Sequence, residues 1–394
     1  MATTSELEAS EVLKNVIEEK KNIQEMMTLQ VLSCNSFGGC HFSNAFVTTQ
    51  KKLSTFPKLS PCGEKANGLY FQHIWDIPKL AVLIQEKQRE DGDIEDTPST
   101  KRPKLLTVEE IKAYACLQRY LKDINIHQKS LEKVLGAAGC CQSDVVKVVG
   151  THLFGPLSEG TCYIGDHLGN VCSCGCGKQL QDGPTGLGVE YTWHGTADLF
   201  VYETIPVAVW SDLEDPDPDI VRPDPEGRDK DYEKYLQKIE LSVQVKKDQA
   251  YSQIMAQTIT NGFAQTNKNE LLAGIPVPTF GCTPSKIMFY AYDCKSDILL
   301  QRLFGVDFVG THSLSKAAVL VWLYLNFTLF MKKDVTNIET HPELKNFQAN
   351  FCSDELIRSS YNHVKAGVKV TAFQNSSKNE THVELVTTRE IQID

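Results

Sequence analysis

Residues 193–210 read Trp-His-Gly-Thr-Ala-Asp-Leu-Phe-Val-Tyr-Glu-Thr-Ile-Pro-Val-Ala-Val-Trp, and this stretch indicates the fold class. It contains two short runs rich in β-favouring residues, 197–202 and 205–210, separated by a short polar link. Runs of the same kind lie on both sides of it. We expect further strands at 161–164, 189–193, 239–245, 287–292 and 298–304.

Helical patterns surround these strands. Capping-box pairs, Ser5 with Glu8 and Thr107 with Glu110, open two of the predicted helices. The predicted helices cover 5–31, 107–123, 128–135, 249–263 and 314–331, and a terminal hairpin is predicted from 364–373 and 382–386. This order of elements predicts an α/β fold with a mixed central sheet flanked by helices.

The length of 394 residues accommodates one large core with additions. A composition that is 41% hydrophobic and 23% charged excludes collagen, coiled-coil and fully disordered chains. We expect four parts: an N-terminal helical and irregular extension, a charged linker, the α/β core with an acidic loop at 211–234, and a C-terminal extension. Their predicted boundaries are 1–86, 87–106, 107–335 and 336–394.

We expect neither secretion nor a membrane span. Its first residues lack a cationic segment followed by an apolar one. The apolar run 317–331 is shorter than the roughly 20 residues that span a bilayer, so a core helix is expected there. Thirteen cysteines without a leader indicate reduced thiols or metal ligands rather than a disulfide framework.

The net charge of −10 is concentrated in one segment. Residues 212–234 hold ten acidic and four basic side chains, which leaves −4 for the other 371 residues. A nearly neutral body is compatible with a local basic groove, so the total charge does not exclude a nucleic-acid partner.

A basic run, Lys101-Arg102-Pro103-Lys104, lies in the predicted linker. It resembles a monopartite nuclear localisation signal, in which proline keeps the cations extended toward an acidic receptor groove. The simpler interpretation is a solvated charged loop. The run predicts a nuclear protein with an import receptor as a partner; the alternative location is the cytoplasm.

Two segments carry the candidate chemistry. In the first, Gly195 leads into a strand with Asp198 near its start. The second, 239–247, is predicted as a strand whose period of two places Ser242, Gln244 and Lys246 on one face. Polar groups on a strand with an apolar opposite face are costly to bury, and such strands are often functional.

These two segments resemble the PD-(D/E)XK nuclease superfamily, in which a Gly-x-x-Asp strand is followed by a strand ending in (Glu/Gln)-x-Lys and then by a helix. The resemblance covers about residues 125–310 and implies a restriction-endonuclease-like core. It implies that Asp198 and Gln244 bind Mg²⁺ or Mn²⁺ and that Lys246 stabilises charge on the phosphate. It further implies that Gln253 on the next helix belongs to the site, together with an upstream acidic residue. Glu132 is the first choice for that acid, and Glu159 or Glu190 are the alternatives.

The first functional hypothesis is therefore a metal-dependent phosphodiesterase that acts on DNA or RNA. The second is a catalytically inactive nuclease-like module that binds nucleic acid or a protein, because Gln244 replaces the commoner glutamate. The structural alternative is that Asp198 caps a turn and Lys246 ends a surface strand.

A third hypothesis comes from a group of cysteines. Cys162, Cys172, Cys174 and Cys176, with His167 nearby, offer ligands that suit Zn²⁺. If residues 172–176 form a strand, their alternating cysteines face one way and do not converge, so zinc is not favoured over free thiols. A zinc-stabilised interaction protein is the corresponding function.

Overall fold

The computed structural model describes most of the chain. The described residues are 9–36, 38–51, 68–90, 106–137, 139–159, 161–165, 168–211, 229–302, 305–308, 313–334, 346–352, 355–369 and 386–387. Lys101 to Lys104, His167 and most of the acidic loop lie outside them, so the expectations for these residues remain expectations.

The fold is α/β with a mixed sheet, as predicted. Among the described residues the main sheet has 12 strands, in the order β16-β1-β13-β12-β11-β10-β9-β5-β6, with β3, β4 and β14 attached beside this path. Its strands are β1 (Gln24–Cys34), β3 (Val47–Lys51), β4 (Gly68–Tyr70), β5 (Cys162–Ile164), β6 (Gln181–Asp182), β9 (Leu199–Val201), β10 (Ile205–Val209), β11 (Val277–Cys282), β12 (Lys286–Asp293), β13 (Ile298–Arg302), β14 (Val306–Asp307) and β16 (Val386–Thr387). The β10–β11 and β5–β6 pairs are parallel, and the other pairs in this sheet are antiparallel.

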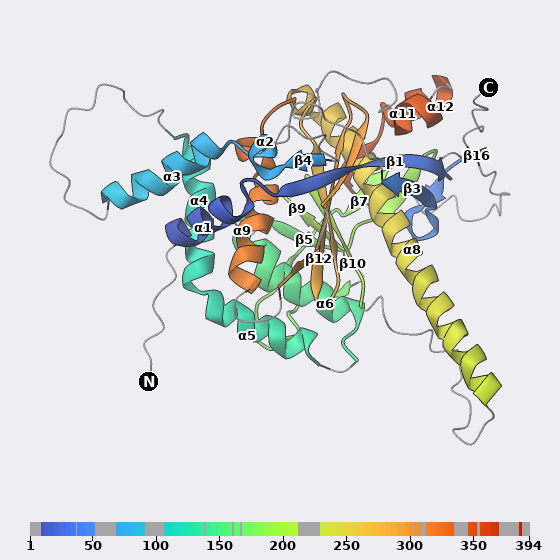
Figure 1. The fold of residues 1–394 in the computed structure, drawn as a ribbon, viewed down its shortest axis with the longest axis horizontal. Coiled ribbons are helices and arrows are strands. Elements are labelled where there is room, and N and C mark those ends of the chain that lie inside the picture. The colour runs from blue at the N-terminus through green and yellow to red at the C-terminus, as the bar shows by residue number, and fades with distance from the viewer. Residues whose placement is uncertain are drawn as a thin grey trace.

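Helices cover both faces of this sheet (Figure 1). The described helices are α1 (Ala9–Lys20), α2 (Phe71–Ile74), α3 (Ile77–Glu90), α4 (Val108–Lys122), α5 (Ile124–Leu135), α6 (Gln142–Val149), α7 (Gly155–Leu157), α8 (Asp229–Lys268), α9 (Ser313–Leu325), α10 (Phe327–Phe330), α11 (Phe347–Phe351) and α12 (Glu355–Tyr361). Three short helical turns join them: η1 (Phe42–Asn44), η2 (Gly150–Phe154) and η4 (Glu270–Leu272). The capping box predicted at Thr107 and Glu110 is confirmed at the start of α4.

Strand β12 shows how the sheet divides the core. Ile287 and Phe289 point into a cluster that includes α1, α4, α5, α6 and α9, whereas Tyr290 and Tyr292 point into a second cluster that includes α8 and α11. This alternation is the period of two that a strand buried on both faces requires. The helix predicted at 314–331 is the buried α9 followed by α10. Among the described residues, no helix is long and apolar enough to cross a membrane.

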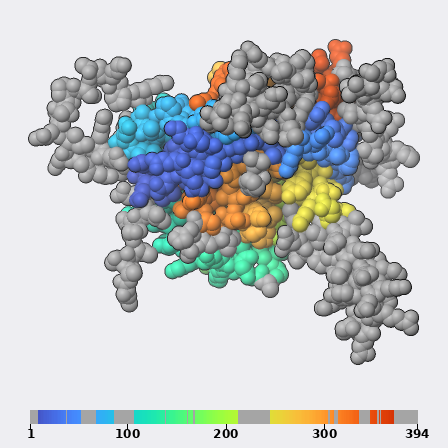
Figure 2. Space-filling view, in the orientation of Figure 1, coloured from blue at the N-terminus to red at the C-terminus, as the bar shows by residue number. Residues whose placement is uncertain are grey.

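A second, smaller sheet lies against α8. It has the order β15-β7-β8-β2, from β2 (Cys40–His41), β7 (Gly186–Gly188), β8 (Trp193–Thr196) and β15 (Lys365–Val368). The C-terminal half of α8 is buried between the sheets, and its N-terminal half projects from the body in yellow-green (Figure 1). The space-filling view shows the blue N-terminal segment lying across the same face as orange chain from the C-terminal third (Figure 2).

Four predicted elements are wrong. The predicted strand 189–193 is the turn between β7 and β8, and only Trp193 lies in a strand. The predicted helix 5–31 ends with α1, and 24–34 is the strand β1, because β13 on one side and β3 and β4 on the other pair with its backbone. The predicted strand 239–245 is part of α8, where helix-favouring residues continue on both sides of it. The described parts of the predicted terminal hairpin do not pair with each other, since β15 pairs with β7 and β16 pairs with β1; residues 370–385 lie outside the described residues.

Candidate metal centre

Residues 170–180 form a tight hairpin that we call the knuckle. Val171 pairs with Gln179, the amide of Cys172 donates to the carbonyl of Lys178, and the amide of Leu180 donates to the carbonyl of Asn170. Gly175 and Gly177 have φ angles of +82° and +75°, a left-handed conformation that glycine adopts at little cost. The chain therefore turns twice within five residues, which a strand does not do.

These turns bring three cysteines together with a histidine from another segment. Nε2 of His152 lies 3.2 Å from Sγ of Cys174 and 3.5 Å from Sγ of Cys176, and Sγ of Cys172 lies 3.3 Å from that of Cys174. The four ligand atoms lie within 4.8 Å of one another. Tetrahedral zinc with Cys and His ligands needs ligand separations of roughly 3.5–3.8 Å, so the group could hold a metal ion, and its donors fit Zn²⁺ better than Mg²⁺.

His152 lies in η2, a π-helical turn between α6 and α7. Such turns interrupt the normal helical spacing and are frequent at functional sites. Burial, and then the charge of Lys178, lower the pKa of His152 to about 4. The imidazole is therefore neutral at pH 7, which is the state in which histidine binds a metal.

Two of the cysteines differ in how readily their thiols ionise. Burial opposes ionisation of Cys174, but hydrogen bonds from Cys176, Cys172 and Ser130 outweigh it, and the pKa of Cys174 falls below its ordinary value. The pKa of Cys172 instead rises to about 12, first because its thiol is buried, so this cysteine would lose its proton only on binding a metal ion. Thiolates are the form of cysteine that binds metals.

His127 orients the histidine ligand. Its Nδ1 lies 3.4 Å from Nδ1 of His152, while Nε2 of His152 faces the sulfur atoms. His152 therefore carries its proton on Nδ1 and donates it to His127, as metal-binding histidines usually do toward an outer partner. His127 is held in turn by Tyr120, on which it stacks with 4.5 Å between ring centroids and 4° between planes.

Two helices hold the knuckle in place. Nζ of Lys133 on α5 donates to the carbonyl of Cys174 over 2.6 Å, and Oγ of Ser173 donates to Oδ1 of Asp144 on α6 over 2.6 Å. Both contacts fix the turn that carries the cysteines. The metal ligands are therefore supported by residues on rigid elements.

These findings correct the zinc prediction in two ways. The cysteines converge because 172–176 is a turn and not a strand, so the argument against zinc is wrong. Cys162 is not in the group; it is buried in β5, and burial raises the pKa of its thiol to about 12. His152 was missed, because it lies 20 positions before Cys172 in an apolar run that carries no ligand spacing.

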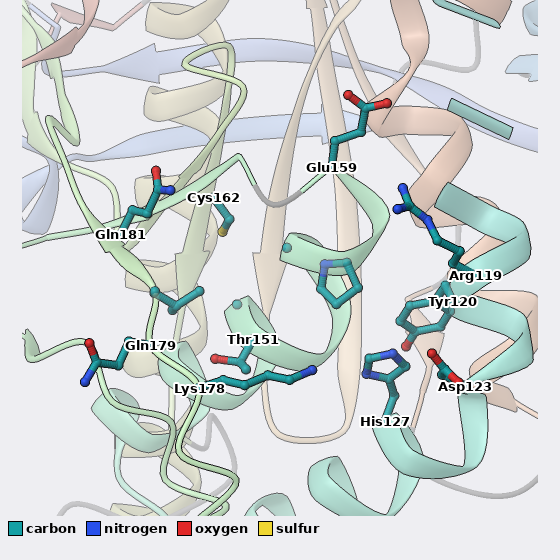
Figure 3. Close-up of a pocket in the computed structure, with 14 residues that line it drawn as sticks. Arg119, Tyr120, Asp123, His127, Thr151, Glu159, Cys162, Lys178, Gln179 and Gln181 are labelled. Atoms are coloured by element: carbon teal, nitrogen blue, oxygen red, sulfur yellow. The ribbon is translucent and has the colours of Figure 1, made fainter. Parts of the chain in front are cut away.

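A pocket of about 610 Å³ lies beside the knuckle. Figure 3 shows Arg119, Tyr120, Asp123 and His127 on one wall, with Lys178, Gln179 and Gln181 on the facing wall. Thr151 lies between the walls. The second wall follows the cysteines directly in the chain, so the position of the knuckle sets the shape of the pocket.

Asp198 lies immediately before β9, and its carboxylate has structural partners. It accepts hydrogen bonds from the amide of Val209 over 2.7 Å and from Nε2 of Gln142 over 3.0 Å. Burial raises the pKa of Asp198 to about 6, against the effect of these two bonds. The carboxylate thus joins the start of β9 to the end of β10 and to α6.

The remaining predicted site residues are not on a strand beside Asp198. Gln244 and Lys246 belong to α8, so the predicted (Glu/Gln)-x-Lys strand is wrong; Gln244 is exposed and donates to Asp248, one turn further along the helix. Gln253 is half-buried on α8. Glu132 is exposed on α5, where it accepts a hydrogen bond from Gln128.

The two alternative acids, Glu159 and Glu190, are both exposed. Glu159 borders the pocket beside the knuckle and has a φ of 52°.

Comparison with known proteins gives no relative: no protein-family model, no curated protein and no solved structure matches the chain.

Proposed function

We propose that the protein is a zinc-stabilised binding protein, in which Zn²⁺ held by His152, Cys172, Cys174 and Cys176 fixes the knuckle and with it one wall of a ligand pocket. The observation that carries the proposal is the convergence of these four ligand atoms within 4.8 Å of one another. Three thiolates and one imidazole are a typical structural zinc set, and the thiolates are poor ligands for Mg²⁺.

The arrangement favours a structural over a catalytic ion. Four protein ligands complete a tetrahedron and leave no position for water or substrate, whereas catalytic zinc sites usually have three protein ligands. The ion would join η2 to the knuckle. Its binding free energy would then contribute to folding of this region.

Metal analysis tests the proposal directly. The protein is produced with zinc in the medium, purified without chelators, and its metal content is measured by mass spectrometry. We expect one zinc per chain, lost in Cys176→Ser and retained in Cys141→Ser. Cys141 is a matched control because it is also an exposed cysteine and lies outside the ligand group. Metal-free wild-type protein, or equal zinc in both variants, would contradict the proposal.

A second candidate function is the nuclease-like module without catalysis. The order of elements supports it, because the strand after Asp198 is followed by β10, α8 and then β11, which is parallel to β10. The second strand after the aspartate, β10, is Ile-Pro-Val-Ala-Val, which has no glutamate, glutamine or lysine. A restriction-endonuclease-like core that has lost its catalytic strand residues would explain both facts.

Cleavage and binding assays separate this candidate from the nuclease hypothesis. Labelled single-stranded and double-stranded DNA and RNA are incubated with the protein and Mg²⁺ or Mn²⁺. We expect no cleavage above a chelated control. Metal-dependent cleavage that Asp198→Asn abolishes would restore the catalytic hypothesis, and absence of nucleic-acid binding would remove this second candidate.

A further inference from the structure

We infer that the pocket beside the knuckle binds a small hydroxylated organic anion, with its phosphate or carboxylate group between Lys178, Tyr120 and His127. The inference rests on the proposed function, because zinc would fix the wall that carries Lys178. It adds the class of ligand and the residues that recognise it.

Tyr120 gives the first indication of a ligand. Its side chain is 1% exposed and lines the pocket, and its hydroxyl has no hydrogen-bond partner among the described residues. A buried hydroxyl without a partner is costly, and native proteins usually satisfy such groups. A ligand oxygen in the pocket would accept this hydrogen bond.

His127 supplies a second donor. Its Nδ1 lies 3.4 Å from Nδ1 of His152 and accepts that proton, which leaves Nε2 as the nitrogen that carries the proton of His127. Since the ring is stacked on Tyr120, two neutral donors lie next to each other on the same wall (Figure 3).

Lys178 supplies the charge. Its side chain runs across the pocket toward His127 (Figure 3), and among the described residues it forms no ion pair. An ammonium beside two neutral donors is a favourable position for an oxyanion.

The border of the pocket selects for hydroxyl groups. Asp123 and Glu159 are exposed carboxylates, and Gln179 and Gln181 offer amide oxygens, so the outer pocket is rich in acceptors (Figure 3). A sugar phosphate or hydroxy acid has an anion for the donors and hydroxyls for these acceptors. The pocket volume of about 610 Å³ lies within the roughly 300–1,000 Å³ range of small-molecule sites.

Calorimetric titration with four probes tests the inference on the zinc-loaded protein. Ribose 5-phosphate and gluconate carry hydroxyls with a phosphate or a carboxylate; ribose lacks the anion, and inorganic phosphate lacks the hydroxyls. We expect at least one of the two hydroxylated anions, ribose 5-phosphate or gluconate, to bind at least tenfold more tightly than ribose and inorganic phosphate. The tighter of the two shows whether the pocket prefers a phosphate or a carboxylate. No binding of either hydroxylated anion, or equal binding of ribose, would overturn the inference.

Three variants assign the binding to this pocket. Lys178→Met should weaken binding about 10-fold to 100-fold, Tyr120→Phe about 3-fold to 10-fold, and Lys129→Met should have no effect. Lys129 is the matched control because it is an exposed lysine on α5 outside the pocket lining. Equal affinity in wild type and Lys178→Met would overturn the inference.

Zinc content is measured in every variant, which separates the two proposals. Full zinc with no anion binding would remove the inference and leave the proposed function. Loss of zinc from Lys178→Met would show that Lys178 balances the charge of the metal centre, and would also overturn the inference. Absence of zinc in wild type would remove the proposed function, and the titration would then be judged on the metal-free protein.

Discussion

Nδ1 of His152 lies 3.4 Å from Nδ1 of His127, so a residue outside the ligand group determines which nitrogen faces the cysteines. The contact joins α5 to η2, and the stacked ring of Tyr120 extends it to α4. The metal centre is therefore coupled to two helices that supply none of its ligands.

Loss of this contact should weaken zinc binding. His127→Phe preserves an aromatic ring for stacking but leaves the Nδ1 proton of His152 without an acceptor. We expect zinc affinity, measured by competition with a chromophoric chelator, to fall about 10-fold to 100-fold. The control is His363→Phe, since His363 is exposed and bonds only locally to the carbonyl of Ser359. A change below twofold would show that His127 does not orient the ligand.

Zinc removal should destabilise the fold. A metal that binds only the folded state stabilises it by about 2.7 kcal/mol at a free concentration 100 times its Kd. Urea unfolding with and without a chelator should show this loss in wild type and in Cys141→Ser, but not in Cys176→Ser. A chelator effect of equal size in all three proteins would place the metal elsewhere.

Asp198 should make stability fall as pH rises. Burial raises its pKa from 3.8 to about 6 in the folded state, so the folded protein binds this proton more tightly than the unfolded chain. The resulting stabilisation is complete below about pH 4, decreases between pH 4 and 6, and is absent above that range. In Asp198→Asn this decrease should be absent, so the difference in unfolding free energy between wild type and variant, measured with urea, should change across pH 4–7.5. An unchanged pH profile would contradict the raised pKa.

The buried ion pair between Arg302 and Glu25 should be sensitive to loss of one partner. Nε of Arg302 lies 2.6 Å from Oε1 of Glu25, whose side chain is 1% exposed. Arg302→Met leaves that carboxylate buried without its cation and should cost about 3–5 kcal/mol of unfolding free energy.

An exposed pair provides the comparison. Nζ of Lys295 lies 2.9 Å from Oδ1 of Asp334, with both side chains partly in water. Lys295→Met should therefore cost much less unfolding free energy than Arg302→Met. Adding Glu25→Gln to Arg302→Met should recover part of the loss, and equal costs for the two single variants would contradict the role of burial.

The local patterns that predicted structure correctly were those with a single physical cause. The capping box at Thr107 and Glu110 uses only neighbouring groups, and it opens α4 as expected. The strands β5, β10, β12 and β13 lie within or close to their predicted runs, because β-favouring residues and polar turns bound them. The order of these strands and the helices along the chain predicted the mixed α/β class.

The incorrect predictions concern positions where residues far away in the sequence determine the local structure. An alternating pattern at 239–245 predicted a strand, but the helix that surrounds it continues through these residues. The cysteines at 172–176 could be recognised as candidate ligands, whereas their turn and their fourth partner could not, because His152 approaches only after α6 and η2 pack against the knuckle. The sequence therefore identified three of the four members of the group.

The position of β1 has a consequence for synthesis of the protein. This early strand pairs directly with β13, so Met26 lies opposite Arg302 although about 276 positions separate them in the chain. Contacts of such long sequence separation slow folding, and strand edges that wait for a partner favour aggregation. During translation β1 cannot acquire this neighbour until the ribosome has released residue 302. A nascent chain stalled before that point should therefore be bound by chaperones that recognise exposed strands, and a chain stalled well beyond it should not.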